Sequence, residues 1–288
     1  MMISVTPSGG ALGARVTGID LAGEISSDDM QAIRAAWIEH HVLAFPDQNL
    51  SDDQLEALTQ RFGVFGAEPY FEPIKPDGHV VSLCRRADEQ APVFAEAWHS
   101  DWSFQENPPI GTCLFSLTIP PVGGDTSFLN QEKALAEMPA ELRAKIEGKQ
   151  GIHSARVAYA PDGTYGEREH GSDRAMKIKY SEDAYNTQAH PLIVTHPESG
   201  RETLNGCFGY IMGIEGMDDA EAHEILLELY HWQNQEQFIY HHKWEENMFV
   251  IWDNRSVLHK ANGGYDGYDR ELHRVTIYSN PELYLKAG

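Results

Sequence analysis

The stretch Trp98-His99-Ser100-Asp101-Trp102-Ser103-Phe104 is the point from which the chain is best interpreted. Large and small side chains alternate in it and aromatic residues are enriched, a pattern that predicts a β-strand. Because successive strand side chains point to opposite faces, His99 and Asp101 would point the same way. An imidazole and a carboxylate on one face supply two ligands for a divalent metal. A third ligand from elsewhere would complete a site of two histidines and one carboxylate.

The tripeptide His99-Ser100-Asp101 is a weak signal when it is taken alone. The chain has 14 histidines and 44 acidic residues, so such tripeptides arise by chance. Another one, His196-Pro197-Glu198, is followed by Ser199-Gly200, which predicts a hairpin turn with Glu198 facing solvent. For His99 and Asp101 the alternative is therefore a surface ion pair on an edge strand.

Composition limits the class of protein. The chain has 288 residues, with 41% hydrophobic and 23% charged, which are values typical of globular proteins. The formal net charge of −22 argues against nucleic acid and anionic membranes as partners, but not against an anionic small molecule. Three scattered cysteines without a CxxC pattern argue against disulfides and zinc–thiolate sites. There is no signal-peptide pattern and no apolar run of membrane-spanning length, so a cytoplasmic protein is expected.

Short strands dominate the predicted secondary structure. Helix starts at residues 26–29 and 51–54 carry a serine N-cap and acidic residues in the first turn, and helices are also expected over 131–149 and 218–233. Strands are predicted over residues 3–5, 14–19, 40–45, 111–119, 125–129, 190–196, 202–205, 238–244, 248–253 and 274–278. No internal repeat or linker interrupts them. The expected fold is one domain over residues 1–288, mainly β with peripheral helices, arranged as a double-sheet jelly roll.

Two segments depart from this strand-rich pattern. Residues 64–97 hold prolines, glycines and charges between short apolar runs, which predicts a lid over a site. Residues 154–188 are polar and weakly periodic, which predicts a mobile insertion.

His259 has the best context for a third metal ligand. It follows the apolar strand at 248–253 and precedes a glycine-rich turn. The alternative is a core histidine with satisfied hydrogen bonds. A zincin site is excluded at His223-Glu224, because Leu227 occupies the position of the second histidine.

The chain resembles, nearly from end to end, the taurine dioxygenase (TauD/TfdA) family of Fe(II)- and 2-oxoglutarate-dependent dioxygenases. The matching motifs follow the family order and lie at residues 13–21, 98–101, 121–126, 190–200, 251–255 and 270–276. The resemblance implies a double-stranded β-helix of cupin type that uses Fe(II), 2-oxoglutarate as co-substrate, and O2. It also implies oxidation of a small anionic or zwitterionic molecule, with succinate and CO2 as products and release of a heteroatom group where the oxidised carbon bears one. A homo-oligomer is expected.

Individual roles follow from the same resemblance. The residues that resemble the iron ligands are His99, Asp101 and His259. Thr126 and Arg270 match the residues that bind the distal carboxylate of 2-oxoglutarate, for which a guanidinium fork is well suited. Arg274 matches the arginine that faces the anionic group of the substrate, and its alternative role is a surface pair with an acid. Arg270 and Arg274 are four apart on a predicted strand and would face the same side.

Two departures from the family bear on the substrate. Glu68, or a neighbour, stands where taurine-type enzymes place a histidine that helps to hold the sulfonate. A carboxylate repels a sulfonate, so an amino-acid-type substrate is favoured over taurine. Ala95 replaces an asparagine near 2-oxoglutarate. The aromatic residues expected to line an apolar substrate pocket, or else to belong to the core, are Tyr70, Phe71, Trp102 and Phe104.

Two rival functions use the same residues. One is a non-catalytic jelly-roll protein that binds a small molecule and has lost the metal. The other is a zinc hydrolase with the same three ligands, which would be active without O2.

Overall fold

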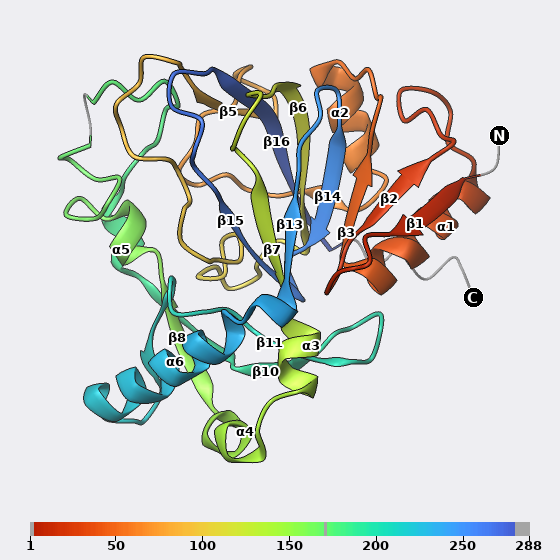
Figure 1. Ribbon diagram of the computed structural model, residues 1–288. Coiled ribbons are helices and arrows are strands. Elements are labelled where there is room, and N and C mark those ends of the chain that lie inside the picture. Colours follow the sequence, from red (N-terminus) through yellow and green to blue (C-terminus); the bar gives the residue numbers. More distant parts are fainter. Residues whose placement is uncertain (1–2, 170–171, 280–288) are drawn as a thin grey trace.

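Strands form most of the regular structure in the computed structural model, which describes residues 3–169 and 172–279 (Figure 1). The largest sheet has eight strands in the order β1-β2-β3-β14-β6-β16-β4, with β5 paired to β16. Its strands are β1 (Ser4–Pro7), β2 (Ala14–Thr17), β3 (Val42–Phe45), β14 (Phe249–Asp253), β6 (Gly111–Thr118), β16 (Arg270–Tyr278), β4 (Val64–Phe65) and β5 (Val81–Arg85). All of these pairings are antiparallel except the one between β2 and β3.

Three smaller sheets complete the β-structure. The first is β13 (Ile239–His242), β7 (Thr126–Asn130) and β15 (Val257–Ala261). The second is β12 (Ile211–Ile214), β8 (Gln150–Ser154) and β9 (Thr187–Pro191), and the third is the hairpin of β10 (Ile193–Thr195) and β11 (Glu202–Leu204). The chain is therefore mainly β, as the sequence predicted.

The helices are α1 (Ser27–His40), α2 (Asp52–Thr59), α3 (Gln131–Ala136), α4 (Ala140–Ile146), α5 (Arg156–Tyr159) and α6 (Asp219–Gln233), with short 3₁₀ turns η1 (Glu182–Tyr185) and η2 (Glu236–Phe238). Ser26 and Ser51 cap α1 and α2 as predicted. The single helix expected over 131–149 is wrong. Pro139 separates α3 from α4, because proline lacks the amide hydrogen and clashes with the preceding turn.

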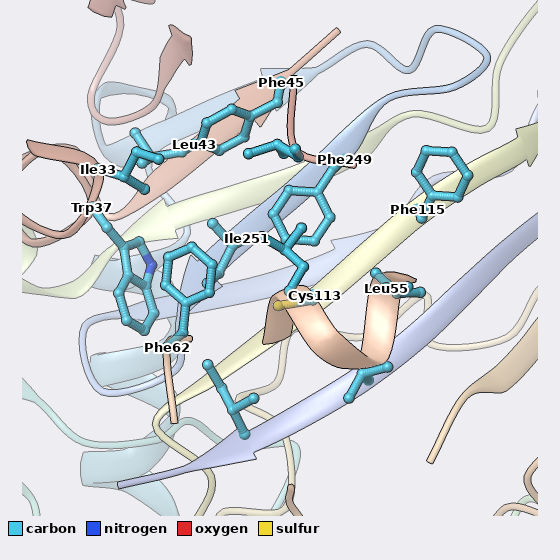
Figure 2. Close-up of a cluster of buried hydrophobic side chains, with 14 of the residues drawn as sticks. Ile33, Trp37, Leu43, Phe45, Leu55, Phe62, Cys113, Phe115, Phe249 and Ile251 are labelled. Atoms are coloured by element: carbon cyan, nitrogen blue, oxygen red, sulfur yellow. The ribbon is translucent and has the colours of Figure 1, made fainter. Parts of the chain in front are cut away.

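Apolar side chains fix the large sheet between two layers. On one face α1 and α2 cover it, with Trp37 against Phe62 at a ring-centroid distance of 5.8 Å (Figure 2). On the other face the sheet of β7, β13 and β15 packs against it, where Phe128 and Trp252 have ring centroids 5.4 Å apart. Burial of each such side chain stabilises the fold by about 1.5–3 kcal/mol. The two facing sheets carry the candidate site between them.

The stretch at 98–104 is not a strand, contrary to the sequence prediction. His99 forms one isolated antiparallel bridge with His259, and the chain turns immediately afterwards over residues 101–104. Trp102 has a φ of 48° in this turn. That left-handed conformation is unfavourable for a bulky side chain and ends the extended backbone that alternation requires.

Residues 64–97, predicted as a lid, and residues 154–188, predicted as a mobile insertion, both contain regular structure. Residues 64–97 include β4 and β5, which pair with β16. Residues 154–188 include α5 and η1, and they contact the other segment, where the Asp173 carboxylate accepts hydrogen bonds from the backbone N–H groups of Gln90 and Ala91 at 2.6 and 3.1 Å. Movement of either segment stays a prediction.

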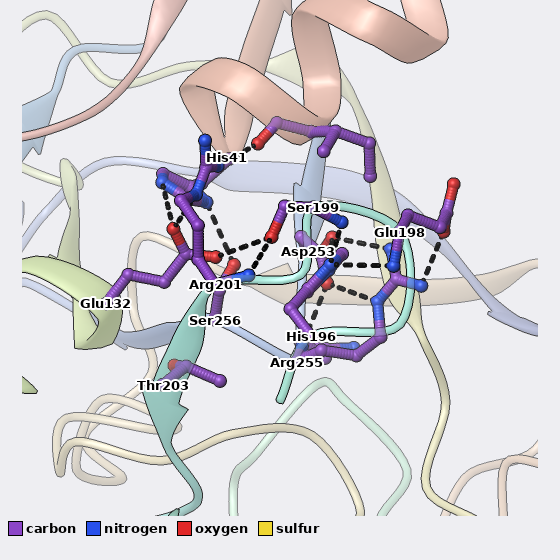
Figure 3. A network of polar contacts seen from close by, with 12 residues as sticks. His41, Glu132, His196, Glu198, Ser199, Arg201, Thr203, Asp253, Arg255 and Ser256 are labelled. Carbon is purple, nitrogen blue, oxygen red and sulfur yellow. Dashed lines mark hydrogen bonds and ion pairs between the residues drawn. The ribbon is translucent and has the colours of Figure 1, made fainter. Parts of the chain in front are cut away.

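A buried polar network joins the β10–β11 hairpin to the turn between β14 and β15 (Figure 3). Asp253 accepts hydrogen bonds from Arg255 at 2.6 Å and from His196 at 3.0 Å. Glu198 forms ion pairs with Arg34 at 2.7 Å and Arg255 at 2.6 Å. The expectation that Glu198 faces solvent is therefore wrong, because its carboxylate forms ion pairs with Arg34 and Arg255. The network fixes the start of β15, the strand that carries His259.

Among the described residues, no helix is both long enough and apolar enough to cross a membrane. The three cysteines are free, with Cys113 and Cys207 buried and Cys84 partly buried, as expected for packed thiols.

Two buried histidines away from the candidate site should make the folded protein less stable in mild acid. Burial lowers the pKa of both His41 and His242 to about 4. In the unfolded chain a histidine has a pKa of about 6.5, so between these values the native state binds fewer protons than the unfolded state. The free energy of unfolding should therefore fall as pH falls through this window, by up to about 1.4 kcal/mol per pH unit for each histidine.

This prediction is checked by urea unfolding at several pH values between 7 and 4. The variant His242→Gln is expected to lose less stability on acidification than the parent protein does, because one buried titrating group has been removed. Equal losses in the two proteins would contradict the assignment to His242.

Candidate metal centre and active site

Three potential metal ligands meet at the bridge between His99 and His259. The ligand atoms of His99, Asp101 and His259 all lie within 4.8 Å of one another, and the three side chains are buried. The Nε2 atom of His99 is 3.8 Å from Oδ1 of Asp101, and Nε2 of His259 is 3.7 Å from Oδ2. The structure thus brings together the residues that the sequence singled out. The alternative of a surface ion pair is wrong, since Asp101 is 1% exposed.

Neighbouring groups hold two of these side chains in place. Nδ1 of His99 lies 2.9 Å from the carbonyl oxygen of Ala97, so Nδ1 carries the proton and the Nε2 lone pair faces the centre. The Thr112 hydroxyl on β6 donates to Oδ2 of Asp101 at 2.6 Å, and Asn254 donates to that hydroxyl at 3.0 Å. The carboxylate is thereby fixed to the large sheet.

The protonation states suit metal binding. Burial lowers the pKa of His99 and lowers that of His259 to about 3, so both imidazoles are neutral near pH 7. Burial by itself would raise the pKa of Asp101, but the charge of Arg274, together with the hydrogen bond from Thr112, outweighs it and lowers the pKa to about 2. Two neutral nitrogen donors and one carboxylate are the donor set that fits divalent iron while leaving coordination positions open.

A cavity beside this centre contains an arginine that has no counter-ion among the described residues. Thr126, Arg270 and Arg274 line the cavity together with His99 and His259. Nε of Arg270 donates to the Gly124 carbonyl at 3.2 Å, and among the described residues no carboxylate forms an ion pair with this guanidinium. Burial lowers the pKa of Arg270. An unpaired cation that is partly withdrawn from water is costly, so this end of the cavity favours an anionic ligand.

Thr126 supplies a hydroxyl in the same cavity. It begins β7 and is 5% exposed. Its Oγ1 accepts a hydrogen bond from Nε1 of Trp244 at 3.0 Å, which leaves the hydroxyl hydrogen available to a ligand. Thr126 and Arg270 therefore line the same cavity, and their binding of one ligand stays a prediction.

Arg274 differs from Arg270 in having two carboxylates beside it. Its Nη2 is 3.1 Å from Oδ1 of Asp101, and its Nε is 3.2 Å from Oε1 of Glu68. The guanidinium lies over the ring of Trp102 at 4.9 Å from the centroid, and the Trp102 indole donates to Oε2 of Glu68 at 3.2 Å. Arg274 is 3% exposed, so the alternative of a surface pair is wrong. We call Glu68, Asp101, Trp102 and Arg274 the Arg274 cluster.

The family model described as "Taurine catabolism dioxygenase TauD, TfdA family" matches residues 4–276. The chain belongs to this family. It is 32% identical over 286 residues to the (S)-phenoxypropionate/alpha-ketoglutarate-dioxygenase of Delftia acidovorans, covering 96% of this chain and 94% of that protein. It is 31% identical to the alkylsulfatase of Acinetobacter baylyi, covering 93% and 82% of the two proteins. The crystal structure of a taurine dioxygenase from Burkholderia xenovorans superposes with a TM-score of 0.78 at 27% identity, covering 96% of this chain and 91% of that one.

Membership of the TauD/TfdA family decides between the enzyme and its rivals. The protein is a 2-oxoglutarate-dependent dioxygenase of the non-haem iron class, which uses Fe(II), 2-oxoglutarate and O2. The donor set of the three buried ligands agrees with that class. The retained group of His99, Asp101 and His259 argues against a non-catalytic protein that has lost the metal, and the dioxygenase relatives argue against a zinc hydrolase.

Sequence reasoning missed the aromatic wall of this TauD/TfdA site. A second cavity next to His99 is lined by residues that include Phe94, Tyr159, Tyr165 and Tyr210. The predicted Tyr70 lies behind this wall, stacked on Tyr159 with ring centroids 4.2 Å apart. Tyr159 and Tyr165 come from residues 154–188, where weak periodicity gave no signal, and only the fold brings them to the metal ligands.

Proposed function

We propose that the protein oxidises a small anionic or zwitterionic organic molecule, with conversion of 2-oxoglutarate to succinate and CO2. One observation carries the proposal. The cavity lined by His99 and His259 is also lined by Arg270, a partly buried guanidinium without an ion-pair partner among the described residues. Such a cavity suits a dianion that reaches from the metal ligands to the arginine.

We assign the residues as follows. His99, Asp101 and His259 hold the iron, and Arg270 and Thr126 bind the distal carboxylate of 2-oxoglutarate. The bound iron supplies the chemistry that couples decarboxylation of the keto acid in the presence of O2 to oxidation of a substrate C–H bond. Arg270 fixes the far end of the co-substrate by charge-assisted hydrogen bonds, so that the keto-acid end points to the metal ligands.

The substrate is proposed to lie beside His99, in the cavity with the aromatic wall. The apolar rings of Phe94, Tyr159 and Tyr210 suit a hydrocarbon or aryl portion and exclude water from it. Arg274, whose guanidinium adjoins Asp101, lines the neighbouring cavity that also contains Arg270, and we propose that it orients a polar group of the substrate from there. The relatives named for phenoxypropionate and alkylsulfate reactions support a small acid as the substrate.

Other expectations from the sequence are kept as proposals. The two facing sheets are proposed to form the double-stranded β-helix, or jelly roll, of cupin type. A homo-oligomer, a cytoplasmic location, and the lack of nucleic-acid and membrane partners stay predictions, as do single-domain behaviour and movement of residues 64–97 and 154–188.

The proposal is tested by adding Fe(II) and 2-oxoglutarate to the purified protein under anaerobic conditions. Chelation of the metal by the keto acid should give a visible charge-transfer absorption band that needs both additions. In air, a screen of amino acids, aryloxy acids, sulfonates and alkyl sulfates should then reveal a compound that stimulates succinate release. Absence of the band, or turnover that proceeds without O2, would contradict the proposal.

A further inference from the structure

Tyr265 lines the same cavity as His99, His259, Thr126 and Arg270, and the proposed function gives it no role. The residue is 5% exposed. Among the described residues, none forms a hydrogen bond with its hydroxyl group. The hydroxyl group of a buried tyrosine ordinarily has a hydrogen-bond partner. Since the protein supplies none within the described residues, the cavity is the place from which a partner can come.

Main-chain hydrogen bonds fix the loop over residues 262–269, which joins β15 to β16. The amide of Asn262 donates to the carbonyl oxygen of Asp125 at 2.9 Å. The amide of Gly124 donates to the carbonyl oxygen of Gly263 at 3.1 Å. Both bonds tie the loop to the chain at the start of β7. The loop and β7 therefore face the cavity as one connected unit.

The ring of Tyr265 contacts the guanidinium group of Arg270. The Cζ atom of Arg270 lies 5.9 Å from the ring centroid, and Cζ of Arg85 lies 5.8 Å from it. Arg85 is itself anchored, since its Nη2 donates to the carbonyl oxygen of Glu89 at 3.1 Å. These contacts hold the phenol ring beside the guanidinium that is proposed to bind the distal carboxylate of 2-oxoglutarate.

The Tyr265 hydroxyl group is a hydrogen-bond donor at neutral pH. Burial raises the pKa of Tyr265, and the positive charge of Arg270 opposes this effect only in part. The phenol therefore keeps its proton. The nearby guanidinium attracts a carboxylate, and a protonated hydroxyl group can donate to one. The hydroxyl group and the guanidinium thus suit the same anionic ligand.

We propose that Tyr265 is a co-substrate-binding residue, whose hydroxyl group donates a hydrogen bond to the distal carboxylate of 2-oxoglutarate. The inference rests on the proposed function, in which Arg270 and Thr126 bind the same carboxylate, and it adds a donor from a different segment. A carboxylate can accept about four hydrogen bonds, so these side chains do not compete for it. Removal of the hydroxyl group should therefore affect only co-substrates that carry a distal carboxylate.

Two keto acids of equal chain length, 2-oxoglutarate and 2-oxovalerate, test the inference. The second acid has a methyl group in place of the distal carboxylate. The parent protein and Tyr265→Phe, which keeps the ring, are loaded anaerobically with Fe(II) and titrated with each acid, and the charge-transfer band reports binding. Tyr265→Phe should bind 2-oxoglutarate about tenfold more weakly than the parent does, because a hydrogen bond to a charged group is lost. Its affinity for 2-oxovalerate should equal that of the parent.

Two controls accompany the titrations. Tyr268 belongs to the same loop and is 44% exposed, so Tyr268→Phe should leave both affinities unchanged. Urea unfolding without a keto acid should give equal free energies of unfolding for the parent and Tyr265→Phe. The reason is that the Tyr265 hydroxyl group has no hydrogen-bond partner among the described residues.

The possible outcomes are distinct. Parental affinity of Tyr265→Phe for 2-oxoglutarate would overturn the inference. An equal loss of affinity for both keto acids, or a lower free energy of unfolding, would overturn it as well, because the hydroxyl group would then support the protein instead of the distal carboxylate. Absence of the band in the parent protein with 2-oxoglutarate would instead contradict the proposed function.

Discussion

Replacing His99 with alanine is expected to abolish succinate formation and to weaken metal binding by more than about a hundredfold. Loss of a residue that only orients a ligand typically costs ten- to a hundredfold in metal affinity, so loss of a ligand should cost more. The neutral Nε2 atom of His99 faces the Asp101 carboxylate at 3.8 Å, and no other histidine among the described residues joins the three-ligand group. Calorimetric titration of Mn(II), a redox-stable stand-in for Fe(II), measures the affinity without turnover.

An exposed histidine supplies the control for this variant. His223 lies on α6 and faces solvent, so His223→Ala should leave both metal affinity and succinate formation at parental values. Circular dichroism and thermal unfolding would show whether His99→Ala retains the fold. Parental turnover by a folded His99→Ala protein would refute the assignment of the metal centre.

Replacing Arg270 with leucine is expected to raise the apparent KM for 2-oxoglutarate by roughly a hundredfold, with a much smaller change in the KM for the primary substrate. Removing one partner of a buried charge pair costs about 2–5 kcal/mol, and about 2.7 kcal/mol corresponds to a hundredfold. Arg270→Lys keeps the charge but loses the two-pronged geometry, and it should give an intermediate value. Dependence of succinate release on 2-oxoglutarate concentration provides the measurement.

Although Arg270→Leu should weaken binding of 2-oxoglutarate, it should not destabilise the ligand-free protein. The guanidinium is partly buried without an ion-pair partner among the described residues, so its removal relieves a desolvation cost. The free energy of unfolding, measured in urea without 2-oxoglutarate, should stay equal or rise. The control is Arg15→Ala, at an exposed arginine on β2, which should leave the KM for 2-oxoglutarate unchanged. An unchanged KM in Arg270→Leu would mean that another residue binds the distal carboxylate.

Local physical chemistry accounts for the parts of the fold that the sequence predicted. Serine N-caps marked the starts of α1 and α2, and the apolar run before Asp253 marked β14. These features depend on neighbouring residues and can be seen along the chain. The break at Pro139 was equally local and should have divided the predicted helix, since proline ends a helix wherever it occurs inside one.

The candidate metal ligands were identified by a different route. His99 and Asp101 were expected to share a face of a strand. The backbone instead turns over residues 101–104, where Trp102 has a φ of 48°. The structure brings these residues together, but the geometric reason was wrong, because resemblance to a family identified them and periodicity did not. His259 likewise had no local signal that separates a ligand from a core histidine.

Charge pairing across the fold was beyond the reach of sequence patterns. Glu68 and Arg274 are separated by more than two hundred residues, and their contact depends on β16 passing beside the segment before Tyr70. The same is true of Glu198, which was expected in solvent but pairs with Arg34 and Arg255. In the sequence, an acidic residue in a turn that pairs with an arginine from a distant element cannot be distinguished from one that faces solvent.

The reciprocal bridge between His99 and His259 has a consequence for local motion. The amide of each residue donates to the carbonyl of the other, at 3.0 and 2.8 Å, so both ligand-bearing segments are joined through the main chain. Opening of the segment around His99 would break both bonds and separate the ligands in one step. Metal binding should therefore slow hydrogen exchange at these two amides together, although neither amide touches the metal. Exchange rates at the bridge would report occupancy of the site directly from the backbone.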